Sequence, residues 1–182
     1  MASAADSVAG IESPGFSLQL QRELRLGSLR YFDAAGALAA NLRELIGPLP
    51  RPLEALQHEL PGTRQEIFLA WRSPTETLIM TADGAAFAAL EARAAEHAAC
   101  GCLVDQTAGL WAWQATGPRV RELLVRLGSA ASVPALGEAR SSRIAELPVL
   151  ALCVREGQFM LLVERVYSEH LLGWMRETAA DF

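Results

Sequence analysis

The sequence contains no lysine, because all 16 of its basic residues are arginine. Charged residues make up only 20% of the 182 residues, and the formal net charge is −5 with the two signs interspersed. Since the chain has neither a basic patch nor a run that mixes aromatic and basic residues, we do not expect it to bind nucleic acid. No apolar run approaches the roughly 18 residues that span a bilayer. The first ten residues are small and acidic, unlike a signal peptide, and we therefore expect a cytoplasmic protein.

The low share of charge has two explanations that the sequence leaves open. A surface that carries little charge is a surface that a partner chain can cover. The same composition also follows from an alanine-rich, GC-rich genome, and the exclusive use of arginine fits that explanation. Composition alone does not decide between a surface covered by a partner chain and the base composition of the genome.

Cysteine is scarce, and its count is odd: Cys100, Cys102 and Cys153. In a cytosolic chain this indicates free thiols rather than a disulfide framework. His97 lies just before the pair, but Cys-x-Cys is not the usual zinc spacing and the third cysteine is far away in the sequence. The pattern favours small buried thiols at a helix-to-strand junction over a metal site.

The sequence also lacks a motif for catalysis. Its three histidines, His58, His97 and His170, are scattered, and none has a cysteine or serine at the spacing of a known nucleophilic motif. His97 falls near the end of an alanine-rich helix, where the helix dipole favours its charged form. We expect no catalytic, cofactor-binding or metal-binding residue in this chain.

Glycines do not supply a nucleotide site either. Gly109, Gly117 and Gly128 are too far apart for a dinucleotide fingerprint, and no helix opens on a glycine-rich turn. Nothing in the sequence is similar to a phosphate loop. The isolated chain is therefore expected to bind no flavin.

Two features of one stretch are distinctive. Asp105 ends an apolar strand, and we expect its carboxylate to cap the turn through Thr107 and Gly109 rather than to contact a ligand. Trp111 and Trp113 alternate, so both point to one face of their strand. Such a pair is either core beneath a helix or an interface anchor, and core is the favoured interpretation.

Periodicity predicts strands joined in pairs, with helices between the pairs. The strands are expected at 24–32 (with Gly27 as a bulge), 67–71, 77–81, 103–105, 110–115, 144–154 and 159–163. The helices are expected at 34–46, 84–99, 118–127 and 168–178. Loops are expected at 48–62, with one helical turn at 53–60, and at 129–142.

Local signals mark several helix ends. Asp83 and Ser168 are predicted N-caps, and Pro118 suits a first helical position. Gly128 is predicted to end its helix with a left-handed residue.

This order predicts an α+β fold with an antiparallel-rich sheet and helices on one face. Residues 1–15, rich in alanine, serine, glycine and proline, are expected to be a flexible N-terminal arm, and 16–182 a single domain. The strand Ile67–Trp71 is apolar on both faces, which indicates burial on both sides or a role in an interface.

One combination of motifs resembles a known family. It consists of Val104-Asp105 followed by Thr107, the helix start Gly117-Pro118-Arg119, and a final segment with Tyr167, Ser168, Leu171, Trp174 and Met175. In this order the motifs resemble the gamma subunit of heterotetrameric sarcosine oxidase and the related folate-binding aminomethyltransferases. The resemblance covers residues 66–175. It departs from the family at 73–78 and at 128–133, so the chain is similar to an outlying member.

The resemblance implies a fold like the aminomethyltransferase folate-binding domain and a function as a non-catalytic accessory subunit. The implied partners are the larger flavoprotein and folate-binding subunits of an amine-oxidising complex, which would hold FAD, FMN, NAD and tetrahydrofolate. The departures from the family pattern also point to a related N-methylamine oxidoreductase, such as an N-methylglutamate dehydrogenase or a dimethylamine-oxidising complex. The alternative is a stand-alone folate-binding protein of one-carbon metabolism.

Overall fold

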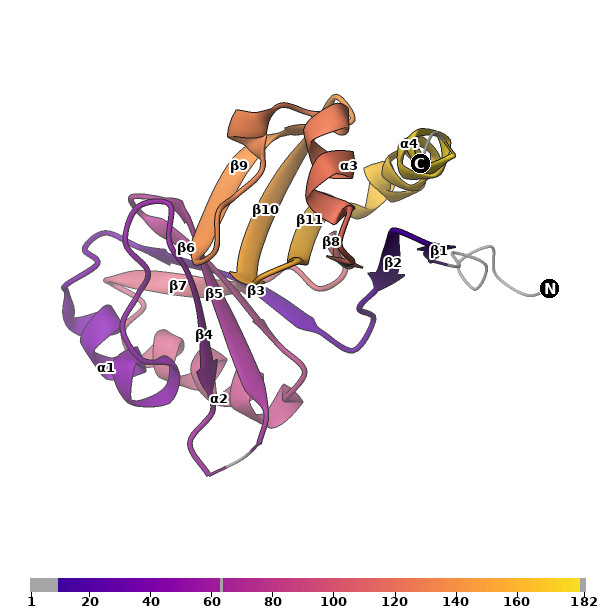
Figure 1. Cartoon of the computed structure of the whole chain (residues 1–182). Helices are drawn as coiled ribbons and strands as arrows, with labels where there is room; N and C mark the ends of the chain where they lie inside the picture. The colour runs from indigo at the N-terminus through magenta and orange to yellow at the C-terminus, as the bar shows by residue number, and fades with distance from the viewer. Residues whose placement is uncertain (1–9, 63, 181–182) are drawn as a thin grey trace.

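The computed structural model describes residues 10–62 and 64–180, and two antiparallel sheets form its centre (Figure 1). The six-stranded sheet has the order β1-β2-β8-β11-β10-β9, and the five-stranded sheet has the order β4-β5-β6-β3-β7. The first sheet comprises β1 (Ile11–Ser13), β2 (Phe16–Leu20), β8 (Leu110–Thr116), β9 (Glu138–Ile144), β10 (Leu147–Arg155) and β11 (Gln158–Glu164). The second comprises β3 (Arg25–Tyr31), β4 (Ala55–Glu59), β5 (Glu66–Ser73), β6 (Glu76–Thr81) and β7 (Gly101–Asp105).

Helices cover the outer face of each sheet. α1 (Ala37–Ile46) and α2 (Gly84–Glu96) pack on the five-stranded sheet, whereas α3 (Val120–Leu127) and α4 (Ser168–Ala179) pack on the six-stranded sheet (Figure 1). Two short 3-10 turns, η2 (Ala130–Ser132) and η3 (Arg165–Tyr167), precede β9 and α4. None of the described helices is long and apolar enough to cross a bilayer.

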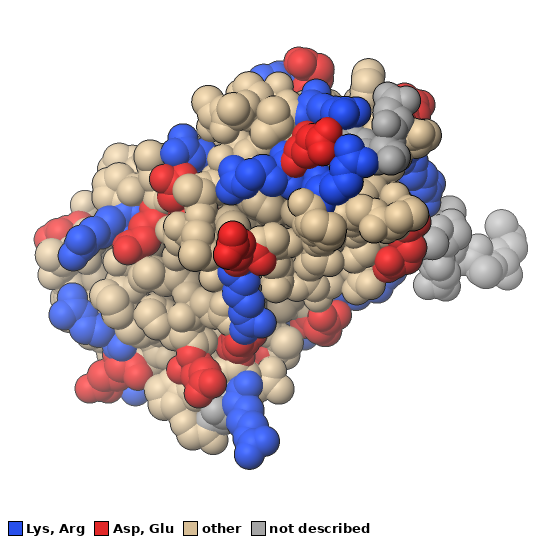
Figure 2. Space-filling model, in the orientation of Figure 1, with Lys and Arg blue, Asp and Glu red and all other residues tan. Residues whose placement is uncertain are grey.

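Three apolar cores follow from this layering. One lies between each sheet and its helices, and the third lies between the two sheets, where Phe68 and Met80 of one sheet meet Leu152 and Met160 of the other. Because every central strand has a core on both sides, its residues are apolar on both faces. Outside these cores, basic and acidic side chains are interspersed over the face drawn in Figure 2.

The α+β class with antiparallel strands is confirmed, but the strands form two sheets rather than one. The predicted pair at 103–105 and 110–115 explains the difference. These segments are β7 and β8, which belong to different sheets, because the turn after Asp105 carries the chain from one sheet to the other. A turn between two strands does not by itself reveal whether those strands pair.

The strand Ile67–Trp71 has a simpler role than an interface. Ile67 and Leu69 are fully buried beneath the helices, while Phe68 and Ala70 are buried between the sheets. This chain itself therefore covers both faces of the strand.

Several local predictions are wrong for identifiable reasons. The segment 53–60 contains β4 and not a helical turn, because its backbone pairs with β5 from Ala55 to Glu59. The segment 129–142 contains η2 and most of β9, a strand whose polar side chains hid its periodicity. The chain reverses between β9 and β10 at Ala145 and Glu146, whose φ values are 52° and 62°. No glycine or asparagine marks that turn.

Structure also begins earlier than residue 16. β1 pairs with β2, and Ile11 is buried, so residues 11–13 belong to the six-stranded sheet and not to a flexible arm of residues 1–15 as predicted. Residues 1–9 lie outside the described residues. The three-residue strand is too short to leave a periodic signal in the sequence.

Three glycine and proline predictions need correction. Gly27 forms no bulge, and instead a Cβ there would lie 2.8 Å from Leu103 and 2.9 Å from Phe87. Gly128 has φ −140°, so it is not left-handed, but a Cβ there would lie 2.9 Å from the Arg143 carbonyl oxygen. α3 begins at Val120, two residues after Pro118. At both positions neighbouring atoms lie so close to the backbone that only glycine, which has no Cβ, fits.

Candidate functional site

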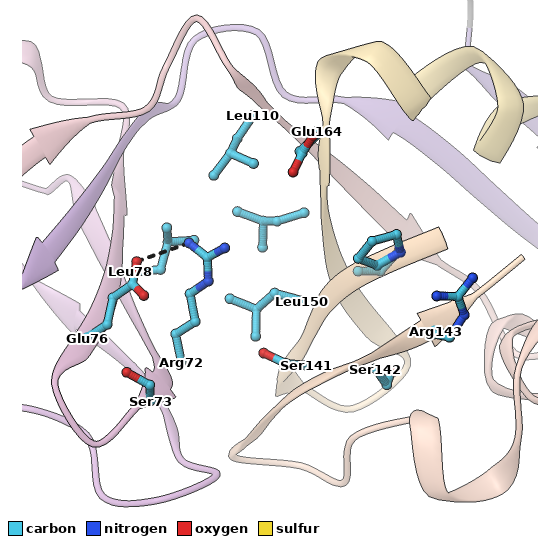
Figure 3. A pocket seen from close by; sticks show the side chains of 13 residues that line it. Arg72, Ser73, Glu76, Leu78, Leu110, Ser141, Ser142, Arg143, Leu150 and Glu164 are labelled. Atoms are coloured by element: carbon cyan, nitrogen blue, oxygen red, sulfur yellow. Dashed lines mark hydrogen bonds and ion pairs between the residues drawn. The ribbon is translucent and has the colours of Figure 1, made fainter. Parts of the chain in front are cut away.

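An open hollow lies where the two sheets separate at one edge (Figure 3). Its volume is about 410 Å³, and its walls come from the β5–β6 hairpin on one side and β9–β10 on the other. The floor is apolar and the rim is polar. The lining includes Arg72, Ser73, Glu76, Leu78, Leu110, Ser141, Ser142, Arg143, Leu150, Leu162 and Glu164.

Glu76 is the most connected polar group at this hollow. Its Oε1 accepts a hydrogen bond from Arg72 Nη1 at 3.0 Å and from the Ser28 hydroxyl. Arg30 Nε lies 4.0 Å from the same oxygen. The Glu76 side chain is only 16% exposed, so these partners compensate the cost of burying a carboxylate.

A serine that donates to a carboxylate has the form of a nucleophile with its base. Ser28 is completely buried on β3, however, so its oxygen cannot meet a substrate. Behind it, the hydroxyls of Tyr31 and Thr77 lie 3.0 Å apart and are also buried. The cluster therefore stabilises the junction of β3 and β6.

Asp105 has the structural role that the sequence predicted. Its Oδ1 accepts a hydrogen bond from the Thr107 backbone N–H at 2.8 Å. Hydrogen bonding from Thr107, supported by the charge of Arg25, holds the pKa of this carboxyl below its ordinary value. Thr107 Oγ1 in turn accepts from the Leu26 N–H at 3.0 Å, which fixes the turn against β3.

The histidines do not come together. His97 is the C-cap of α2, as its position near a helix end suggested. His170 lies on α4, where its Nε2 accepts a hydrogen bond from Trp174 Nε1 at 3.0 Å. His58 lies on β4, far along the chain from both.

The thiols differ in their surroundings. Cys153 is buried, Cys100 is half-buried and Cys102 is exposed on β7, so the expectation of buried thiols fails for Cys102. All three are free. Within the described residues, no group of three or more His, Cys, Asp or Glu side chains is placed to hold a metal ion.

The two tryptophans divide between core and surface. Trp113 is fully buried against the helices, whereas Trp111 is only partly buried at the end of the same face. The guanidinium of Arg165 lies 5.3 Å from the Trp111 ring centroid, and that of Arg22 lies 6.0 Å from it. The core interpretation therefore holds for Trp113, and Trp111 forms part of the surface.

A pterin or flavin ring is held by polar groups aimed into its cavity, and the most connected polar group at this hollow, Glu76, already accepts from Ser28 and Arg72. Among the described residues, the one buried side-chain N or O atom without a partner is His58 Nε2. It lies beside Gly47, where an added Cβ would be 3.3 Å from it.

Sequence reasoning did not find the Glu76 cluster. Its members come from three strands, and each is an ordinary polar residue in the sequence. A weak signal exists, since Arg72 and Glu76 flank the turn of a predicted hairpin and are spaced as an ion pair across it.

Comparison with known proteins shows a likeness in structure. The chain is similar to one chain of the heterotetrameric sarcosine oxidase from Corynebacterium sp. U-96 in complex with pyrrole 2-carboxylate, with a TM-score of 0.79 and 20% sequence identity. That match covers 98% of this chain and 91% of the other. No family model matches the sequence, and no curated protein matches it.

A second solved structure is similar over part of its length. It is the glycine cleavage system aminomethyltransferase T from Bartonella henselae, with a TM-score of 0.63 and 13% identity. The match covers 88% of this chain but only 46% of that one, so this chain spans about half of that protein. The resemblance to sarcosine oxidase subunits and to the aminomethyltransferase fold is thus confirmed at the level of the fold.

Proposed function

We propose that this chain is a non-catalytic, gamma-type accessory subunit of a heteromeric flavin-dependent sarcosine oxidase or a related N-methylamine oxidoreductase. One observation carries the proposal: the match to a chain of the heterotetrameric enzyme covers nearly the full length of both chains, 98% and 91%. The match to the aminomethyltransferase leaves more than half of that protein without a counterpart here.

In this proposal the chemistry belongs to the partner subunits. FAD, FMN, NAD and tetrahydrofolate are held by the larger flavoprotein and folate-binding chains, and this chain contributes a stabilising surface in the cytoplasm. The Glu76 cluster supports this division, because its buried serine and engaged carboxylate are arranged to hold strands together.

Co-purification tests the proposal directly. The tagged chain is expressed alone and together with the products of the genes that adjoin its own in the native genome. We expect the chain alone to show no visible flavin band and the co-expressed chain to elute with flavin-containing partners. A chain that elutes without those partners would overturn the proposal.

A stand-alone folate-binding protein is the alternative, and the likeness to aminomethyltransferase T is the observation that favours it. Calorimetric titration of the isolated chain with tetrahydrofolate separates the two. The subunit proposal predicts no heat of binding, whereas saturable binding by the chain alone would support the alternative.

A further inference from the structure

Three hollows of this chain share lining residues. The hollow between the sheets shares Leu110 with a second hollow of about 160 Å³, which lies around Trp111 and Arg165. The hollow between the sheets also shares Glu76 with a third hollow, of about 470 Å³, which lies around Phe32 and Cys102. We call the surface formed by the residues that line these three hollows the seam groove. Its residues come from strands of both sheets.

The charge of the seam groove is opposite to that of the chain. Although the whole protein carries a net charge of −5, the three hollows are lined by five arginines and two glutamates. These residues are Arg22, Arg30, Arg72, Arg143, Arg165, Glu76 and Glu164. A local excess of cations on an acidic protein favours an acidic partner.

Arg165 is the cation best placed to meet that partner. Its side chain is exposed and lies 5.3 Å from the Trp111 ring centroid, and it forms no ion pair with any residue that the structure describes. Stacking on the indole holds the guanidinium in place without using its hydrogen-bond donors. These N–H donors remain available for a bidentate pair of hydrogen bonds to a carboxylate.

Two exposed apolar side chains line or adjoin the groove. Phe32, which lines the third hollow, is 83% exposed, and Val166, which follows Arg165 in the chain, is 79% exposed. Tyr167 beside it is 40% exposed. Tryptophan and arginine are among the residue types that dominate binding energy at protein interfaces, and Trp111 and Arg165 lie together here.

From these observations we infer that the seam groove is the docking surface for an acidic segment of a larger subunit in the proposed complex. The inference rests on the proposed function and adds the place of contact and the chemistry of the partner. A carboxylate of the partner pairs with Arg165, while Phe32 and Val166 are covered by apolar side chains of the same partner.

The test compares four variants of the full chain for binding to the purified flavoprotein subunits. Arg165→Glu and Phe32→Ser change two residues that line the groove, and both side chains are exposed, so folding is preserved. Arg43→Glu on α1 and Leu136→Ser, whose side chain is 61% exposed outside the groove, are the matched controls. We expect Arg165→Glu to weaken binding by about tenfold or more and Phe32→Ser to weaken it measurably, with both controls unchanged.

Salt and thiol labelling give two further measurements. Wild-type affinity should fall as sodium chloride rises from about 0.05 to 0.5 M, since exposed charges are screened. Cys102 lines the groove, so its labelling by a thiol reagent should slow in the complex. An affinity that does not change with salt concentration would show that the partner segment is not acidic.

Three other outcomes would overturn the inference. If the groove variants bind as well as the controls, the contact lies elsewhere, although the subunit proposal stands. If the wild-type chain itself captures no flavoprotein subunit, the proposed function fails and the inference fails with it. If Arg165→Glu instead dissociates a dimer of the isolated chain in sedimentation, the occupant is a second copy and the heteromeric contact is wrong.

Discussion

Trp113 Nε1 donates a hydrogen bond of 2.8 Å to the hydroxyl of Ser168, and both residues are completely buried. The bond joins the centre of β8 to the first residue of α4. Ser168 was predicted as the N-cap of this helix, but Tyr167 holds that position and makes no side-chain cap. The serine oxygen is turned inward because a buried indole N–H needs an acceptor.

Ser168→Ala should therefore destabilise the protein by about 1–3 kcal/mol, the usual cost of leaving a buried donor without a partner. Urea denaturation measures the change. Ser141→Ala, at an exposed serine on β9, is the control and should stay near the wild-type value. In a double-mutant cycle with Trp113→Phe, the two losses should not add, since both remove one bond. Additive losses would mean that the bond contributes nothing.

The helices were predictable because each depends on its own periodicity. All four predicted helices are present, with ends within three residues of those expected, and Asp83 caps α2 by accepting from the Ala85 and Ala86 N–H groups. The pairing of the strands was not predictable to the same degree. A strand such as β5 is apolar on both faces whether its second face meets helices, a sheet or a partner chain.

The candidate site was the least predictable feature. The turn capped by Asp105 could be inferred, because an aspartate bonds to a backbone two residues ahead of it. The seam groove could not, because it arises where two sheets separate and depends on residues from β3, β5, β8 and β11. No short segment of the sequence contains that information.

The face of α3 provides a test of the core under the six-stranded sheet. Leu124 is fully buried, whereas the neighbouring Val125 is 36% exposed. Leu124→Ala should cost about 2–5 kcal/mol of unfolding free energy, since it leaves a cavity between helix and sheet. Val125→Ala should change stability by less than about 0.5 kcal/mol. Equal losses in a denaturant titration would contradict this orientation of the helix.

Glu138 should make stability depend on pH in the acid range. Its Oε2 accepts from the Ala135 N–H at 2.9 Å and from Arg140 Nε at 2.9 Å, and these bonds hold the pKa of the carboxyl below its ordinary 4.5. The unfolded chain therefore takes up this proton first as the solution is acidified. The stabilisation is complete above about pH 4.5 and is lost as pH falls through the lower folded value.

Glu138→Gln should thus lower stability by about 0.5–1 kcal/mol at pH 7, a modest value because the side chain is partly exposed to solvent. The difference from wild type should shrink as the pH is lowered below the ordinary glutamate range. Denaturant titrations between pH 7 and pH 3 measure it. Leu124→Ala is the control, since its loss involves no titrating group and should stay constant. A constant difference for Glu138→Gln as well would show that the ion pair with Arg140 contributes no pH dependence.

The thiols should react in an order that their burial sets. Cys102 is exposed on β7, whereas Cys153 is 2% exposed, donates to the Arg155 carbonyl oxygen at 3.2 Å, and has a pKa raised by burial. Because the thiolate is the reactive form, Cys153 is both shielded and poorly ionised. A disulfide reagent at pH 8 should therefore label Cys102 rapidly in the native protein and Cys153 only after unfolding. Cys102→Ser should remove the fast phase and Cys153→Ser should retain it, and a fast phase that survives in Cys102→Ser would show that a thiol other than Cys102, such as the half-buried Cys100, is the reactive one.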